Sequence, residues 1–381
     1  MRGVPAKGRV VVNRENGNIM KRISTHCMIG LAVALAALNS RAAEATLSGP
    51  FTHRNLQIFL VHGGTELESR RYATLSEALA KGYVVVKETS SVQELSIENL
   101  SKETTVFLNA GDIVKGGRQD RTVRDDLILP PGSGAVALAT FCVEHGRWTK
   151  RGDESATAFG SNSKVLSSRK EKLAARYGAN QSDVWSSVAE QQLQLNSNLG
   201  LLSGKSVDVR SPASASSLQL ALENKDLADV ARQYMDKLNP ILNEKTDVIG
   251  FVYAINGELN SAEVYNNKTL FRALWPKLLD AAVTEAITDY RPDRSAQSPV
   301  QAADVKALFR TALSGTVTER PVWKSTRVKT YTTPTAVLFE TLDLDAHGAW
   351  IHKSFISKEN DRVVVPLDRD SLLNQQRPGR Q

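Results

Sequence analysis

The sequence predicts an α+β fold: an antiparallel, β-rich N-terminal half with packed helices, and a C-terminal extension of one helix and several strands. Three observations indicate this class. Short apolar runs rich in β-branched residues follow one another closely up to residue 143, which is typical of an antiparallel sheet or sandwich. Apolar residues at helical spacing recur between residues 164 and 287. A further helical pattern and three strand-like runs follow.

The N-terminal half is expected to consist of short strands joined by tight turns. A helical turn at residues 75–79 should have Thr74 as its N-cap and end at Gly82. Residues 122–129 and 135–143 should pair with each other across the turn Pro130-Pro131-Gly132. The other strands are expected at residues 53–61, 83–88, 94–100 and 104–109.

The second half should begin with helices at residues 164–177, 182–196 and 214–238. Residues 247–267 then predict a hairpin, because Asn256-Gly257 is the dipeptide that a type I′ turn prefers. A long amphipathic helix should cover residues 270–287, with Pro276 kinking or interrupting it. The remaining elements are expected to be a helix at residues 302–313 and strands at residues 326–333, 335–343 and 349–357.

The N-terminus predicts a secretory leader. Residues 1–42 hold seven Lys or Arg and one Glu, so they carry +6 of the formal net charge of +7. The high isoelectric point is therefore no indication of nucleic-acid binding. A positive pair at Lys21-Arg22, an apolar core at residues 28–38 and small residues up to Ala45 are typical of a signal peptide. The expected location is periplasmic or secreted, with an uncleaved anchor as the alternative reading and no membrane span after processing.

The expected organisation has four parts. A leader at residues 1–42, whose true start is expected at Met20, precedes a domain at residues 50–290. A C-terminal helix and strands at residues 291–373 should pack on the same core, and residues 374–381 should form a disordered tail. Only Cys142 remains after leader removal, so no intrachain disulfide can form.

Polar residues interrupt two apolar runs between residues 108 and 148, and this is where a site is expected. Charged side chains beside apolar strands cost free energy unless they form ion pairs or take part in binding or catalysis. The paired glycines Gly116 and Gly117 allow two interpretations. They could form a loop whose backbone N–H groups bind an anion together with Arg121. They could also form a tight turn between two strands, which is the more common role of such a pair. The spacing fits neither a phosphate-binding loop nor a dinucleotide fingerprint.

The run CVEHGRW at residues 142–148 brings a thiol, a carboxylate and a guanidinium close together. On a strand, Cys142 and Glu144 share a face, and a carboxylate beside a thiol disfavours the thiolate, so Cys142 is expected to be a buried apolar residue. Glu144 should form an ion pair with Arg147 or Arg121, either structural or facing a ligand. The six histidines are scattered, so no metal site and no cofactor are expected.

These motifs resemble a known family. The blocks LSEALAKG, GDIVKGGRQDR, PPGS, CVEHGRW, DVW and FRALWPKLL are similar in order and spacing to a largely bacterial domain associated with ADP-ribosylglycohydrolases and rhodanese-phosphatases, over roughly residues 50–290. The resemblance implies a link to ADP-ribose or nucleotide metabolism. The chain departs from the family pattern at Asp120, where asparagine is expected, and at His145, where glutamine is expected. The positions matching its signature are Asp112, Gly116, Gly117, Gln119, Arg121, Cys142, Glu144, Arg147 and Trp148.

Two functions remain open from the sequence. In the first, the domain binds or hydrolyses a small phosphate-bearing or ADP-ribose-like molecule; Asp112 and Glu144 are the catalytic candidates. The ligand-binding candidates are Gly116, Gly117, Gln119, Arg121, Arg147 and Trp148. In the second, it is a non-enzymatic envelope protein whose charges hold strands together and whose surface binds an unknown protein partner. An open pocket lined by these charges would favour the first function, and a sealed, paired arrangement the second.

Overall fold

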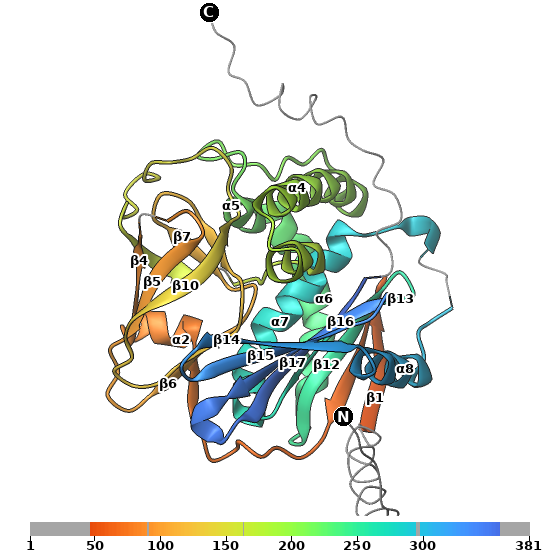
Figure 1. Cartoon of the computed structure of the whole chain (residues 1–381). Coiled ribbons are helices and arrows are strands. Elements are labelled where there is room, and N and C mark those ends of the chain that lie inside the picture. Colours follow the sequence, from red (N-terminus) through yellow and green to blue (C-terminus); the bar gives the residue numbers. More distant parts are fainter. Residues whose placement is uncertain (1–45, 90, 163, 295–297, 359–381) are drawn as a thin grey trace, which may run out of the picture. The chain divides into compact units, whose positions relative to one another are not determined.

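The computed structural model describes residues 46–358 apart from Ser90, Ser163 and residues 295–297 (Figure 1). Its largest β structure is an eight-stranded antiparallel sheet, in which strands from the start, the middle and the end of the chain lie side by side in three successive groups. In spatial order the strands are β1 (Thr46–His53), β2 (Leu56–His62), β12 (Val248–Ile255), β13 (Glu258–Tyr265), β17 (Ala349–Ser357), β16 (Ala336–Asp343), β15 (Thr326–Thr332) and β14 (Thr316–Trp323). The α+β class is confirmed.

The hairpin between β12 and β13 forms as the sequence predicts. Asn256 and Gly257 both have positive φ, at 53° and 79°, which is the backbone that a type I′ turn requires. The strands on either side are buried on both faces, because side chains alternate between two hydrophobic clusters. Phe251 and Tyr253 face one cluster, whereas Val252 faces the other.

A second β structure is a closed six-stranded barrel, in the order β10-β5-β4-β11-β7-β8. Its strands are β4 (Val84–Glu88), β5 (Glu94–Asn99), β7 (Ile113–Gly116), β8 (Arg121–Val123), β10 (Gly134–Cys142) and β11 (Ala158–Asn162). Val86, Leu95, Val123 and Leu138 fill its apolar interior. A three-stranded sheet of β3 (Tyr72–Thr74), β6 (Thr105–Leu108) and β9 (Leu127–Leu129) adjoins it, with β3 and β6 parallel.

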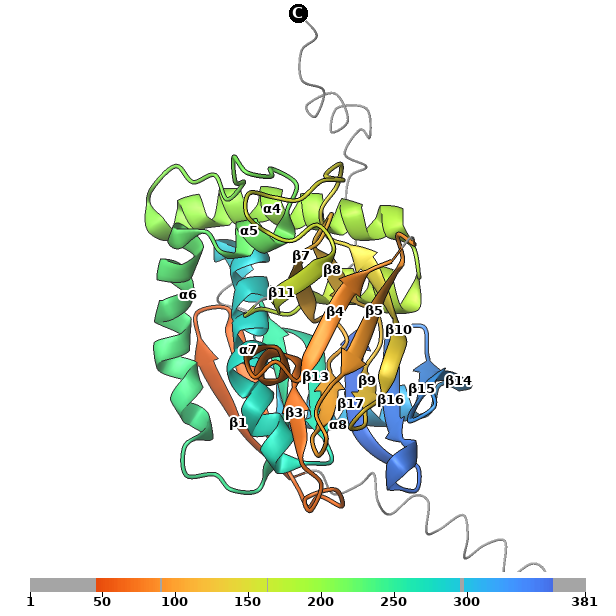
Figure 2. The ribbon, with the colours of Figure 1, turned by 90° about the vertical axis from the view of Figure 1, so that its left-hand side faces the viewer.

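Helices cover both faces of the large sheet. α6 (Lys225–Leu238) and α7 (Lys268–Thr288) pack on one face, and α8 (Ala302–Leu313) packs on the other. α4 (Gln181–Ser203) lies across the ends of α6 and α7 (Figure 2). The short helices are α2 (Leu75–Ala80), α3 (Arg169–Lys172) and α5 (Leu218–Leu222), with a π-turn at Leu173–Tyr177 and 3₁₀ turns at Asn239–Leu242, Pro292–Arg294 and Leu344–Ala346.

Several element predictions are confirmed at residue level. Thr74 caps α2 in a capping box with Glu77, because its side chain accepts the Glu77 N–H and the Glu77 carboxylate accepts the Thr74 N–H. The helix at residues 302–313 and the strand at residues 349–357 have the predicted bounds. The predicted long helix forms as α7, but it continues through Pro276, so an interruption there is wrong.

Other element predictions are wrong, for reasons of tertiary pairing. The run at residues 53–61 is a hairpin turn plus β2, not one strand. Residues 122–129 split into β8 and β9, which belong to different sheets, so the expected pairing with residues 135–143 forms only in part: β8 pairs with the end of β10, with Thr122 opposite Phe141, whereas β9 pairs with β6. The helix expected at residues 164–177 begins at Arg169, and that expected at residues 214–238 is two helices. β1, β3, β7, β11 and β14 were not expected from the sequence.

The predicted leader at residues 1–42 and the predicted tail at residues 374–381 lie outside the described residues. Within the described part of the chain, none of the helices has the length and apolar character needed to cross a bilayer.

Candidate functional site

The signature segment GDIVKGGRQDR forms β7, a tight turn and β8 at one end of the barrel. Gly117 has a φ of 57°, and a Cβ atom there would lie 2.5 Å from both the Glu88 carboxylate and the Phe159 ring. The backbone N–H groups are used within the protein: that of Gly116 donates to Asp120 Oδ1 at 3.1 Å, and that of Gly117 to the Ala158 carbonyl at 3.3 Å. The geometry is that of a tight turn with satisfied donors.

Beside this turn lies a buried ionic network, which we call the Asp120–Glu144 network; it consists of Asp120, Glu144, Arg147, Arg151 and Ser217. Arg151 donates to both carboxylate oxygens of Asp120, at 3.0 and 3.1 Å. Arg147 Nε donates to Glu144 Oε1 at 2.6 Å, and the Asp120 N–H donates to Glu144 Oε2 at 3.0 Å. Ser217 Oγ donates to Asp120 at 2.8 Å. Both carboxylates are fully buried, so each charge is paired and sealed from solvent.

The electrostatics of this network oppose acid catalysis. Burial alone would raise the pKa of Glu144, but the hydrogen bonds from Arg147, Ser214 and the Asp120 backbone outweigh it and lower the pKa. A general acid needs the opposite shift. The predicted pairing of Glu144 with Arg147 is therefore present, and it is buried.

Arg121 stands apart from this network. By strand alternation its side chain points into the barrel, on the same face as Val123, and it is the largest fully buried side chain of the described residues. One amino group donates to the backbone and side-chain oxygens of Gln119, at 3.1 and 3.3 Å. The other lies 3.8 Å from the Glu88 carboxylate, and Nε has no partner. This guanidinium is buried with much of its donor capacity unused.

The groups next to Arg121 complete a polar layer at this end of the barrel, which we call the Arg121 layer; its members are Arg121, Glu88, Gln119, Thr140 and Cys142. Cys142 is directly opposite Arg121 in the β8–β10 pairing, and Thr140 lies two residues earlier on the same face. Thr140 Oγ1 is buried without a partner. Burial raises the pKa of the Cys142 thiol to about 11, so it stays protonated and is no nucleophile at neutral pH.

The remaining predicted site residues lie elsewhere. Asp112 forms a buried ion pair with Lys277 of α7 and accepts the Asn109 N–H at 2.9 Å. Gln119 is buried, and its amide also donates to the Glu144 carbonyl at 2.9 Å. The Trp148 side chain is half exposed. The fold thus brings Gln119, Arg121, Glu144 and Arg147 to one end of the barrel and does not add the Asp112 carboxylate to them.

Sequence reasoning missed a second buried network, centred on His352 of β17, which we call the His352 network. Its ring lies between two carboxylates, with Nδ1 2.9 Å from Asp126 and Nε2 2.9 Å from Glu263. Arg176 donates to Asp126 at 3.1 Å, and Lys172 donates to Glu263 at 2.8 Å. Burial lowers the pKa of His352, but both carboxylates outweigh it and raise the pKa, which favours the imidazolium form of the ring.

The contacts of the His352 network leave no ring nitrogen of His352 free. Both ring nitrogens are engaged by carboxylates, so neither is available to a nucleophile or substrate. A signal was present in the sequence: Asp125 and Asp126 interrupt the apolar run of residues 121–129, and charges there must find partners. Its partner His352 lies 226 residues away, so the partner could not be inferred. Within the described residues, no group of three or more His, Cys, Asp or Glu could hold a metal ion.

One comparison with known proteins identifies a family. The sequence model of ARPP-1, described as the ARG and Rhodanese-Phosphatase-superfamily-associated Protein domain, matches residues 44–356. This is the family whose resemblance the motifs indicate, and the match extends through the C-terminal strands. No curated protein and no solved structure matches the chain significantly.

Proposed function

The chain belongs to the family of ARG and Rhodanese-Phosphatase-superfamily-associated Protein domains, and we propose that it binds a small phosphate-bearing ligand through the Arg121 layer. The observation that supports this most directly is Arg121 itself. A guanidinium that is 1 % exposed, with an unpartnered Nε and its nearest carboxylate at 3.8 Å, is costly to bury. A phosphate offers two oxygen acceptors that can bind the planar guanidinium fork in a bidentate manner.

The neighbouring groups suit recognition of an anion more than hydrolysis. Thr140 Oγ1 supplies a hydroxyl without a partner, and Gln119 orients the guanidinium. Hydrolysis would need a general acid whose pKa is raised or a general base that is free to accept a proton. Asp112 is engaged by Lys277, and Glu144 has a lowered pKa, so their predicted catalytic roles find less support than a binding role for Arg121. The association in the family's name, with ADP-ribosylglycohydrolase and rhodanese-phosphatase proteins, fits a ligand of this kind.

A non-enzymatic structural role is the second candidate. The Asp120–Glu144 network favours it, and so does the sealed position of Arg121, which is 1 % exposed. Both carboxylates of that network are paired with arginines and buried away from solvent. Buried ion pairs of this kind are typical of charges that connect segments of a fold. The two candidates differ in what they require of Arg121 and Arg147, so one pair of variants separates them.

Arg121→Met is expected to keep most of the stability and to weaken ligand binding. It removes a guanidinium whose present bonds are few, so the free energy of unfolding should fall by about 1 kcal/mol or less. Loss of charge-assisted hydrogen bonds worth roughly 1.5–3 kcal/mol should weaken the affinity by about tenfold to a hundredfold. The measurement pairs the melting temperature with calorimetric titration, using nucleotides and sugar phosphates, ADP-ribose included, that stabilise the wild type in a thermal-shift screen.

Arg147→Met is the matched control. It leaves Glu144 with one strong partner fewer in a sealed site, so it should cost roughly 3–5 kcal/mol of stability. If Arg121→Met instead lowers the melting temperature strongly and leaves the affinity unchanged, Arg121 has a structural role and does not bind the ligand. If no phosphate-bearing compound binds the wild type, the binding proposal is wrong.

Export is a separate proposal that rests on the leader sequence alone. Its positive region, apolar core and small-residue end predict cleavage near residue 45. Intact-mass measurement of the protein after expression should give an N-terminus between Ala43 and Thr46. The mass of the full chain, recovered from a membrane fraction, would show an uncleaved anchor instead.

A further inference from the structure

A small cavity lined by polar and charged residues lies away from the barrel, where the N-terminus of α3, the middle of α4 and the C-terminal end of α7 meet. α4 crosses the end of α7 here (Figure 2). The inner volume of the cavity is about 10 Å³, which is room for one water-sized group. Gln191, Thr288, Asp289 and Ser187 are among the residues that line it.

The lining offers several acceptors, and the cation among the residues that line it, Lys170, is already bound to Glu190 at 2.6 Å. Gln191 is 6 % exposed, and its side-chain Oε1 is buried with no hydrogen-bond partner. The Asp289 carboxylate accepts no hydrogen bond from the described residues. The hydroxyl protons of Ser187 and Thr288 are committed to the backbone carbonyls of Asp183 and Thr284, at 2.9 and 2.8 Å, which leaves their oxygens to accept.

The other charges around the cavity are already paired. Glu190 of α4 is bound by Lys170 of α3 at 2.6 Å. Glu285 of α7 accepts from Tyr253 at 2.9 Å and from Asn260 at 3.0 Å, and its Oε1 lies 3.8 Å from the Arg169 guanidinium. Among the carboxylates that line the cavity, Asp289 therefore has no direct contact with a cation in the described residues. Its negative charge is available to a positively charged ligand.

We propose that this cavity binds a primary ammonium group. A cation with several N–H donors satisfies the Gln191 oxygen, the Asp289 carboxylate and a hydroxyl oxygen together, and its size matches the inner volume. The alkyl part of such a ligand leaves through the open side of the cavity. A divalent metal ion is disfavoured, since no cluster of three ligating carboxylates or imidazoles exists among the described residues.

The raised pKa of Asp289 agrees with a carboxylate whose negative charge the surrounding described residues compensate only in part. Burial is the main cause that raises its pKa to about 6, and the negative charge of Glu285 adds to the shift. Lys170, Arg169 and Arg291 act in the opposite direction without cancelling it. A bound ammonium group would lower this pKa, so affinity should weaken as the pH falls below about 6, where the proton competes with the cation.

The test titrates the full chain with methylammonium chloride at constant ionic strength, with calorimetry and thermal denaturation as readouts. Tetramethylammonium chloride carries the same charge but has no N–H donor and a larger head. Saturable binding of methylammonium at pH 8, with no comparable effect of tetramethylammonium, is the expected result. Equal effects of both salts, or no saturable effect of methylammonium because the cavity holds only water, would overturn the proposal.

Variants locate the binding. Asp289→Asn should weaken methylammonium binding at least tenfold, and Gln191→Leu, which removes the orphaned oxygen at similar volume, should weaken it severalfold. Asp229→Asn makes the same chemical change on the surface of α6, outside the cavity, and should leave affinity within twofold. Circular dichroism and melting temperature confirm that each variant is folded. Unchanged affinity in folded Asp289→Asn would place the binding elsewhere and refute the site.

Discussion

Replacement of Asp126 by asparagine is expected to lower the free energy of unfolding by about 3–5 kcal/mol, because it leaves buried cations without their counter-charge. Asp126 is fully buried and accepts from the Ala110 N–H at 2.7 Å, from Arg176 at 3.1 Å and from the Thr341 hydroxyl. It also lies 2.9 Å from His352 Nδ1. Burial alone would raise the pKa of Asp126, but Arg176 and His352 together hold it well below its usual range.

Chemical denaturation at pH 7 measures this effect, and Asp208→Asn is its control. Asp208 pairs with Arg210 at 2.8 Å, but both side chains are half exposed, so the same substitution there should change stability by less than about 1 kcal/mol. A loss below about 1 kcal/mol in Asp126→Asn as well would mean that the His352 network relaxes or admits water. The network would then not be a main support of the fold.

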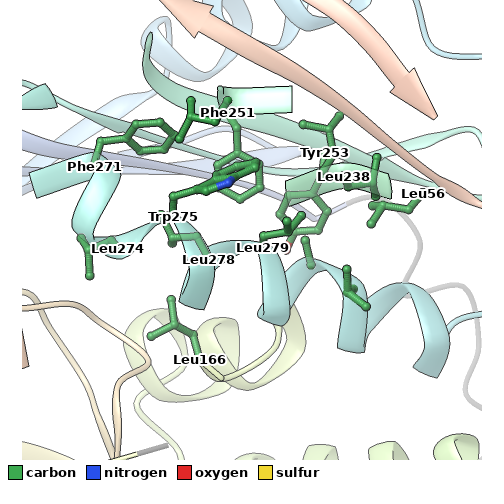
Figure 3. Packing of buried hydrophobic residues seen from close by; sticks show 14 of the residues in the cluster. Leu56, Leu166, Leu238, Phe251, Tyr253, Phe271, Leu274, Trp275, Leu278 and Leu279 are labelled. Carbon is green, nitrogen blue, oxygen red and sulfur yellow. The ribbon is translucent and has the colours of Figure 1, made fainter. Parts of the chain in front are cut away.

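Trp275→Ala is expected to cost roughly 3–5 kcal/mol, since it removes a large buried aromatic side chain and leaves a cavity. Trp275 is 3 % exposed and packs between α7 and the large sheet, edge-on to Phe251 with ring centroids 5.4 Å apart (Figure 3). The Phe271 ring lies 5.9 Å away on the same helix. The sequence predicts this burial from helical spacing alone, and the structure confirms it.

The measurement is again the denaturant midpoint, with Trp148→Ala as the matched control. Trp148 is 50 % exposed, so the same truncation there should change stability by about 0.5 kcal/mol or less. A wild-type midpoint for Trp275→Ala would contradict the packing. A loss of ligand affinity in stable Trp148→Ala would support its predicted binding role, which the structure leaves as a prediction.

Local sequence patterns were sufficient for the elements that local physics decides. Asn256-Gly257 specified its hairpin because two adjacent residues can adopt positive φ. Thr74 and Glu77 specified the start of α2, because a capping box spans only four residues. The spacing of Leu274, Leu278 and their neighbours predicted the buried face of α7. Each of these signals is contained within one or two turns of the chain.

The candidate site was predicted only in part. The sequence identified Glu144 and Arg147 as a pair, because charges beside an apolar strand need partners nearby. It did not identify Arg151 as the partner of Asp120, nor separate the saturated Asp120–Glu144 network from the under-coordinated Arg121. That distinction depends on which face of β8 points into the barrel, and barrel closure is decided by strands far apart in the sequence.

By itself, the sequence determined the α+β class, the family and most individual helices and strands, because turn chemistry, capping and hydrophobic periodicity act over a few residues. Only the tertiary structure decided the pairing of strands. The run at residues 121–129 divides between the barrel and a second sheet, although it is nearly continuous in apolar character. His352 finds Asp126 across 226 residues of chain. Such pairings require that two distant segments can be buried against each other with every charge paired. This condition depends on the whole fold, so no single segment of the sequence can specify it.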